Sequence, residues 1–111
     1  KYWFEFFIDY TSAATTTGSR WTINGPAFSR LAYSSNYSLT ASSNIFNNAV
    51  VYDIPAASSA SSANIAGNVA CITGFVTPSV DGNIIARFAS EIAGSAITAK
   101  AGSVCRWMQV V

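Results

Sequence analysis

Apolar and polar side chains alternate with a period of two along much of this chain of 111 residues. The alternation is clearest at the start, where residues 2–10 place an unbroken apolar series on one face of a predicted strand. The other face of that strand carries Trp3, Glu5, Phe7 and Asp9. A strand with one wet side does not carry aromatic rings on both faces, so both faces of this opening strand are expected to be covered.

The last third of the chain, residues 81–111, shows the same signal. An Asp-Gly pair precedes the first of three alternating stretches, and glycine-containing turns at residues 93–95 and 101–103 separate them. Short glycine turns between alternating apolar residues are typical of β-hairpins. Residues 84–92 and 104–111 are therefore predicted strands, and both again carry apolar side chains on two faces.

Further strands are predicted in the middle of the chain. They lie in residues 20–24, 28–33, 44–52 and 67–77, and turn residues such as Asn24-Gly25-Pro26 end them. Residues 53–63 form an alanine- and serine-rich loop with little to pack, where a short helical turn is the one helical element expected.

These strands predict the fold class and its core. The expected architecture is all-β: an antiparallel jelly-roll β-sandwich of about eight strands in two four-stranded sheets. The side chains expected to be nearly fully buried in its core are Phe4, Phe6, Ile8, Phe75 and Phe88.

Length and composition indicate one domain, residues 1–111, with a surface poor in charge. The chain starts with Lys1 rather than Met, which favours a segment of a longer or processed chain. Charged residues make up 10% of the sequence and hydrophobic residues 50%, whereas soluble domains carry about 25% charged residues. A surface with so few charges favours an oligomer, in which further copies of the chain cover part of it. The alternative is a monomer whose surface is rich in Ser, Thr and Asn.

The same composition argues against several functions. Six basic and five acidic side chains leave a net charge of +1 without a basic run, so no nucleic-acid partner is expected. No apolar run approaches the ~20 residues of a membrane span. The chain has no histidine and no Cys-x-x-Cys pair, so neither a metal nor another cofactor is expected. The few carboxylates lack a nucleophile or base beside them, so no enzyme is predicted.

The two cysteines, Cys71 and Cys105, both fall in predicted strands. A disulfide between them stays open at this point, because spacing alone does not establish bonding. Two buried free thiols that pack as small hydrophobic residues are the favoured interpretation.

Two stretches carry a resemblance to a known group. They are the run Ala-Ala-Thr-Thr-Thr-Gly-Ser-Arg-Trp-Thr-Ile-Asn-Gly-Pro at residues 13–26, and the Asp-Gly, Arg-Phe-Ala and Gly-Ser-Ala-Ile-Thr-Ala-Lys-Ala-Gly-Ser motifs of the last third. The sequence resembles the C-terminal trimeric β-domains of phage tail-fibre and minor structural proteins, which are similar to the tumour-necrosis-factor and complement-type jelly roll. The resemblance implies a bacteriophage virion protein, located in the virion, that forms a homotrimer and contacts other virion proteins. It further implies a fibre or spike head that attaches to a host surface, or alternatively a capsid decoration (cement) protein that stabilises the shell.

Candidate residues follow for both kinds of contact. A host-surface glycan is a candidate ligand for a ring of aromatic and amide side chains, with burial of the two tyrosines as the alternative: Tyr33, Asn36, Tyr37 and Asn44. The candidate subunit interface comprises the second-face aromatics and two arginines that could pair with Glu5 and Asp9: Trp3, Phe7, Trp107, Arg87 and Arg106.

Overall fold

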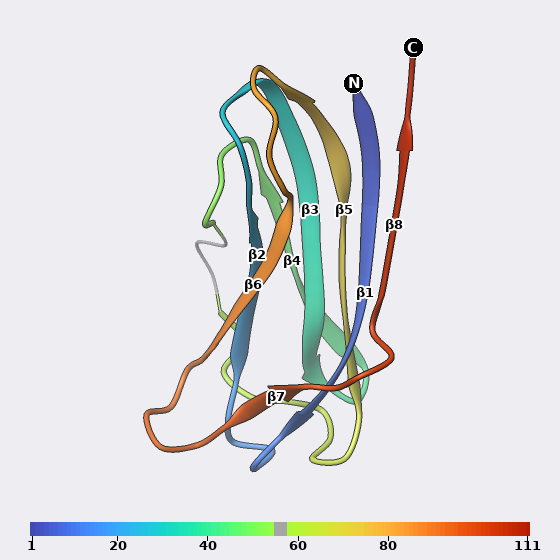
Figure 1. Ribbon diagram of the computed structural model, residues 1–111. Helices are drawn as coiled ribbons and strands as arrows, with labels where there is room; N and C mark the ends of the chain where they lie inside the picture. Colours follow the sequence, from blue (N-terminus) through green and yellow to red (C-terminus); the bar gives the residue numbers. More distant parts are fainter. Residues whose placement is uncertain (55–57) are drawn as a thin grey trace.

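The computed structural model describes residues 1–54 and 58–111, and these residues form two antiparallel β-sheets without a helix (Figure 1). The strands of the described residues are β1 (Tyr2–Ser12), β2 (Ser19–Asn24), β3 (Phe28–Thr40), β4 (Ser43–Ala49), β5 (Asn68–Pro78), β6 (Ile85–Ser90), β7 (Ile97–Ala99) and β8 (Val104–Gln109). The predicted all-β class is confirmed, and each expected strand is found at its place in the sequence.

The strands are divided six to two between the sheets. The large sheet has the order β4-β3-β5-β1-β7, and β8 also pairs with β1. The small sheet consists of β2 and β6. The predicted division into two four-stranded sheets is therefore wrong, and the strand order does not confirm a jelly roll. The reason is the length of β1, because β7 pairs with its Tyr10–Ser12 end and β8 with its Tyr2–Phe7 end, both along one edge.

The core lies between the inner face of the large sheet and the small sheet. Its buried apolar side chains are Phe4, Ile8, Tyr10, Trp21, Ile23, Leu31, Tyr33, Tyr37, Ala70, Ile72, Val76 and Ile97. Burial of Phe4 and Ile8 confirms the expected inner face of β1. Phe6, which was expected to be nearly fully buried, is only partly buried because it borders the open side of the sandwich. Burial of a large apolar side chain contributes about 1.5–3 kcal/mol, so this cluster is the main source of stability.

Two of the expected core residues are exposed. Phe75 is 42% exposed, because its partner across the strands is Trp3, on the outer face of the large sheet. Phe88 points inward from β6 and stacks on Trp21, yet it is 44% exposed because β6 is the last strand of its sheet. The period of two predicts which residues share a face, but it does not predict which face or which strand edge is covered.

The alanine- and serine-rich loop packs more closely than expected. Ser59 and Ser62 are buried, and the Ser59 hydroxyl accepts a hydrogen bond from the Ser19 amide at 2.8 Å. A Cβ atom at Gly18 would lie 1.7 Å from the Ser59 carbonyl oxygen, so only glycine allows this approach. The loop thus lies against β2 and covers its outer edge. Residues 55–57, where part of the expected helical turn falls, lie outside the described residues, and the described part of the loop is not helical.

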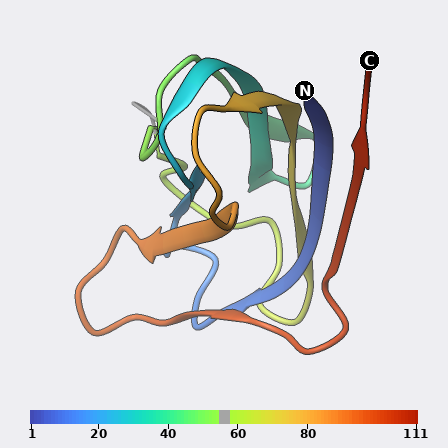
Figure 2. The same cartoon turned by 45° about the horizontal axis from the view of Figure 1, so that its top comes forward.

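The opposite side of the sandwich is open. Among residues 1–54 and 58–111, β6 pairs only with β2 and β8 only with β1, each along one edge. Figure 2 shows β6 and β8 on opposite sides of this opening, and β8 stands at the margin of the molecule with the C-terminus at its far end.

Candidate functional site

The outer face of the large sheet carries an apolar cluster on β1, β5 and β8. The cluster consists of Trp3, Phe7, Phe75, Val104 and Met108, of which Trp3 is half-buried and the others are exposed. Strand pairing places them together, since Trp3 lies opposite both Phe75 and Met108, and Phe7 lies opposite Val104. We refer to these five side chains as the outer-face cluster.

An ion pair lies in the middle of the outer-face cluster. Arg106 of β8 donates from Nε to Oε1 of Glu5 at 3.1 Å, and its Nη2 contacts the same oxygen. The guanidinium carbon of Arg106 also lies 5.9 Å from the Trp3 ring centroid and 5.8 Å from that of Phe7. The Glu5 side chain is 14% exposed, so its charge is matched within the chain and covered by its neighbours.

Of the predicted interface residues, Trp3, Phe7 and Arg106 are brought together here, whereas Arg87 and Trp107 lie elsewhere. Arg87 of β6 donates from Nη1 to Oδ1 of Asp53 at 2.7 Å, so it pairs with neither Glu5 nor Asp9. Trp107 projects from the inner side of β8, since it lies opposite the inward-facing Phe4.

Trp107 belongs to the open side of the sandwich. A cavity of about 580 Å³ extends from Trp107 and Cys105 past Phe4 and Phe6 to the segment that precedes β6. A second cavity of about 250 Å³ lies between Phe6, Phe88 and Cys105. Trp107 is 68% exposed although it points inward. We refer to this apolar opening between β6 and β8 as the seam.

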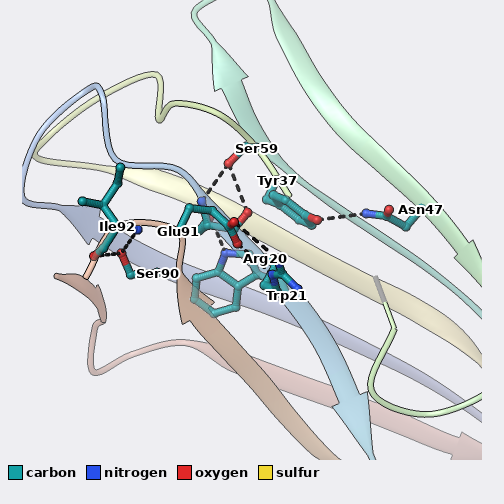
Figure 3. A network of polar contacts seen from close by, with 9 residues as sticks. Arg20, Trp21, Tyr37, Asn47, Ser59, Ser90, Glu91 and Ile92 are labelled. Atoms are coloured by element: carbon teal, nitrogen blue, oxygen red, sulfur yellow. Dashed lines mark hydrogen bonds and ion pairs between the residues drawn. The ribbon is translucent and has the colours of Figure 1, made fainter. Parts of the chain in front are cut away.

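The four residues predicted to bind a glycan do not form one surface. Tyr33 and Tyr37 point into the core, where burial raises the pKa of both hydroxyls. The Tyr33 hydroxyl contacts the Thr22 hydroxyl at 2.9 Å and the Ile54 carbonyl at 2.7 Å. Asn47 donates to the Tyr37 hydroxyl at 3.0 Å (Figure 3). The alternative considered from the sequence, that both tyrosines are buried, is therefore the one found in the structure.

The amides lie on the other side of the sheet. Asn44 of β4 donates to the Asn36 side-chain oxygen of β3 at 3.2 Å. Asn36 lies opposite Phe46, whose ring is 70% exposed. The half-buried Asn36 and the exposed Asn44 therefore lie beside Phe46, on the hairpin of β3 and β4, and not beside the two tyrosines.

A second polar network joins the small sheet to the loop that covers it (Figure 3). Arg20 donates from Nε to Glu91 Oε1 at 2.7 Å, and this hydrogen bond holds the pKa of the Glu91 carboxyl below its ordinary value. The Trp21 indole nitrogen donates to the Ser19 hydroxyl at 3.0 Å. Sequence reasoning missed this network, although opposite charges near the ends of two predicted strands were a signal for it.

Chemistry beyond packing and polar contacts is not evident in the described residues. They contain no group of three or more His, Cys, Asp or Glu side chains that could hold a metal.

Both cysteines are free thiols, as favoured from the sequence, but the prediction that both are buried is wrong: Cys105 is exposed and Cys71 is half-buried. The two residues belong to opposite faces of the large sheet, because Cys71 lies opposite Phe7 and Cys105 opposite Phe6. The described residues contain no helix long and apolar enough to cross a membrane.

No protein-family model, no curated protein and no solved structure matches this chain. The class that the fold defines is an antiparallel all-β sandwich.

Proposed function

We propose that this domain is a self-associating structural protein of a bacteriophage virion, the trimeric head of a fibre or spike that attaches to a host surface. The observation that carries the self-association is the outer-face cluster. The resemblance of the sequence to tail-fibre domains supplies the virion and the trimer. No catalytic step is part of the proposal.

The outer-face cluster has the properties of a subunit contact. Its side chains are apolar and largely aromatic, and the half-buried Glu5 in its middle is already paired with Arg106. Interface centres are depleted in charge and enriched in aromatic residues and arginine. A paired charge does not have to be desolvated alone when a second copy covers it. Trp3, Phe7 and Arg106 are thus the proposed contact residues of the homotrimer.

Attachment to a host glycan is proposed for the hairpin of β3 and β4. Phe46 offers an exposed ring, and Asn36, Asn44 and Asn48 offer amide groups on the same face of the sheet. An aromatic face stacks on the apolar face of a sugar ring, and amides donate to and accept from its hydroxyls. This site replaces the ring of tyrosines that was expected from the sequence.

Sedimentation of the domain at micromolar concentration tests the proposed trimer. The wild-type chain should sediment in assemblies built of trimers, and Phe7→Ser should dissociate them. Phe46→Ser is the matched control, because it removes an exposed phenylalanine from the far edge of the same sheet and should leave the association unchanged. A wild-type chain without trimers, or equal effects of the two variants, would overturn the trimer.

Binding to host cells or isolated surface polysaccharide tests the attachment site. Phe46→Ser should weaken binding at least tenfold, which corresponds to about 1.4 kcal/mol. Phe7→Ser is no control here, since trimers bind with avidity, so Val69→Ser, an exposed position on the outer face of β5, serves instead. Unchanged binding by the Phe46 variant would exclude this hairpin.

A further inference from the structure

β8 is an edge strand whose outer edge is free. Its six residues are all exposed, and among the described residues it pairs with β1 alone. The Val110 amide donates to the Lys1 carbonyl at 2.8 Å, and this bond shows which residues of the strand are hydrogen-bonded to β1. In an antiparallel pair, alternate residues bond to the same neighbour. The backbone groups of Cys105, Trp107 and Gln109 therefore point away from β1 and are available to another strand.

This edge lacks the features that keep edge strands apart. Proline, lysine and bulges are the usual protection, and β8 contains none of them. Its single charge, on Arg106, is held by Glu5 on the outer face. By contrast, β4 at the opposite edge of the sheet is rich in asparagine. A free strand edge whose one charge is already paired within the chain is a template for the addition of a further strand.

We propose that the free edge of β8 pairs with β8 of a second copy of this chain, antiparallel, with Trp107 on the two-fold axis. The contact differs from the outer-face cluster and does not rest on the proposed trimer. It joins the two large sheets into one continuous sheet.

The register follows from the hydrogen-bonding phase. Outward-pointing residues have to face each other, so the two-fold axis lies at a residue between 105 and 109. The pairing of this strand with β1 extends to Val110, so an axis at Met108 leaves an overlap of residues 106–110 and an axis at Gln109 one of 108–110. An axis at Cys105 leaves an overlap of residues 104–106 only, because β8 begins at Val104. An axis at Arg106 places two arginines opposite each other, which is unfavourable. An axis at Trp107 extends the overlap over residues 104–110 and places no like charges together.

The Trp107 register pairs residues of compatible chemistry. Val104 then faces Val110, Cys105 faces Gln109, and Arg106 faces Met108 of the second copy. The two Trp107 side chains lie side by side on the inner face, where each indole is 68% exposed in the single chain. They lie at the openings of both seams. One two-fold contact therefore gives hydrogen-bond partners to the free backbone groups of both β8 edges and also covers apolar surface of both seams.

Two charge variants at the axis test the register. Trp107→Lys and Trp107→Glu each place like charges directly opposite in the symmetric pair, and each should abolish the edge contact. An equimolar mixture of the two variants should restore it, because lysine then faces glutamate. Sedimentation equilibrium at low salt measures both effects, and the restored contact should weaken at least tenfold in high salt.

The background for this test is Phe7→Ser, which removes the proposed trimer contact. In that background the wild-type edge should give dimers, the single charge variants monomers, and their mixture dimers. Circular dichroism confirms that each variant keeps its strands, as expected for an exposed position. Monomers with wild-type Trp107, or dimers that persist in either charge variant alone, would overturn the edge contact. Dimers without trimers in the chain that keeps Phe7 would instead contradict only the proposed trimer.

Discussion

The rings of Trp21 and Phe88 stack with their centroids 4.6 Å apart and their planes 18° apart. Trp21 is fully buried, whereas Phe88 is 44% exposed. The two rings join β2 to β6. Trp21 also packs against Tyr10 of the large sheet, whose ring centroid lies 4.8 Å from that of Trp21. The small sheet is thus attached to the large one by aromatic packing.

Replacement of the two stacked rings should have unequal effects. Trp21→Ala should lower the free energy of unfolding by about 3–5 kcal/mol, because it removes a buried ring and leaves a cavity. Phe88→Ala should cost about 1–2 kcal/mol, since it removes the stack and only part of a buried surface. Urea titration measures both. Equal losses would mean that β6 is covered in solution by another part of the molecule or by a second copy.

Ser59→Ala tests the anchoring of the alanine- and serine-rich loop. The substitution leaves the buried Ser19 amide without the acceptor that it has at 2.8 Å. An unsatisfied buried donor costs about 1–3 kcal/mol. Ser79→Ala, at an exposed serine, is the control and should change stability by less than about 0.5 kcal/mol. Indistinguishable urea midpoints for the two variants would contradict the buried role of the loop.

Gly74, which is buried within β5, and Gly67, which is exposed just before it, should respond differently to alanine. A Cβ atom at Gly74 would lie 2.4 Å from both the Ala32 carbonyl oxygen and Tyr33 Cβ, so Gly74→Ala should destabilise the protein by about 1–3 kcal/mol. Gly67 has nothing within 4 Å of such an atom. Gly67→Ala should therefore be neutral or stabilise by up to about 1 kcal/mol, through reduced freedom of the unfolded chain. Thermal unfolding of the two variants is the measurement, and a tolerated Gly74→Ala would contradict the close pairing of β3 and β5.

The ion pair of Arg20 and Glu91 should make stability depend on pH. The hydrogen bond from Arg20 lowers the pKa of Glu91 from its ordinary value of 4.5. A lowered pKa in the folded state gives stability that is fully present above the unfolded value and is lost as pH falls through the folded one. Glu91→Gln should thus cost about 0.2–1 kcal/mol at neutral pH, the range for exposed pairs, and the difference should vanish in acid.

Urea titrations from neutral pH down to below the pKa of Glu91 measure this effect. Asp81→Asn is the control for net charge, because it removes one carboxylate from an exposed turn. A difference between wild type and Glu91→Gln that persists unchanged in acid would show that the carboxylate charge is not what stabilises the contact.

Much of the secondary structure could be predicted from the sequence. The alternation over residues 2–10 corresponds to β1 at Tyr2–Ser12, and that over residues 67–77 corresponds to β5 at Asn68–Pro78. The second apolar face of β1, with Trp3 and Phe7, was also predicted and forms part of the candidate site. These features depend on side chains a few residues apart on one strand, and the period of two reports that relationship directly.

The candidate site could be predicted only in part. Trp107 and Arg106 are neighbours on one predicted strand, and the alternation correctly separates them onto opposite faces. It does not say that Arg106 meets Glu5 or that Arg87 instead meets Asp53, because these pairs join residues far apart in the chain. The glycan site was misplaced for a similar reason: Tyr33 and Asn36 alternate correctly, but the face that carries Tyr33 is the buried one.

The sequence by itself determined where the strands lie and which side chains share a face, since backbone geometry imposes alternation within each strand. The tertiary structure alone decided which face is covered, how the strands divide six to two between the sheets, and which edges stay free. Those outcomes depend on pairings between distant segments, such as β7 and β8 along the one edge of β1. The alternation of apolar and polar side chains is the same in a central strand and in an edge strand, so only the assembled sheets distinguish them.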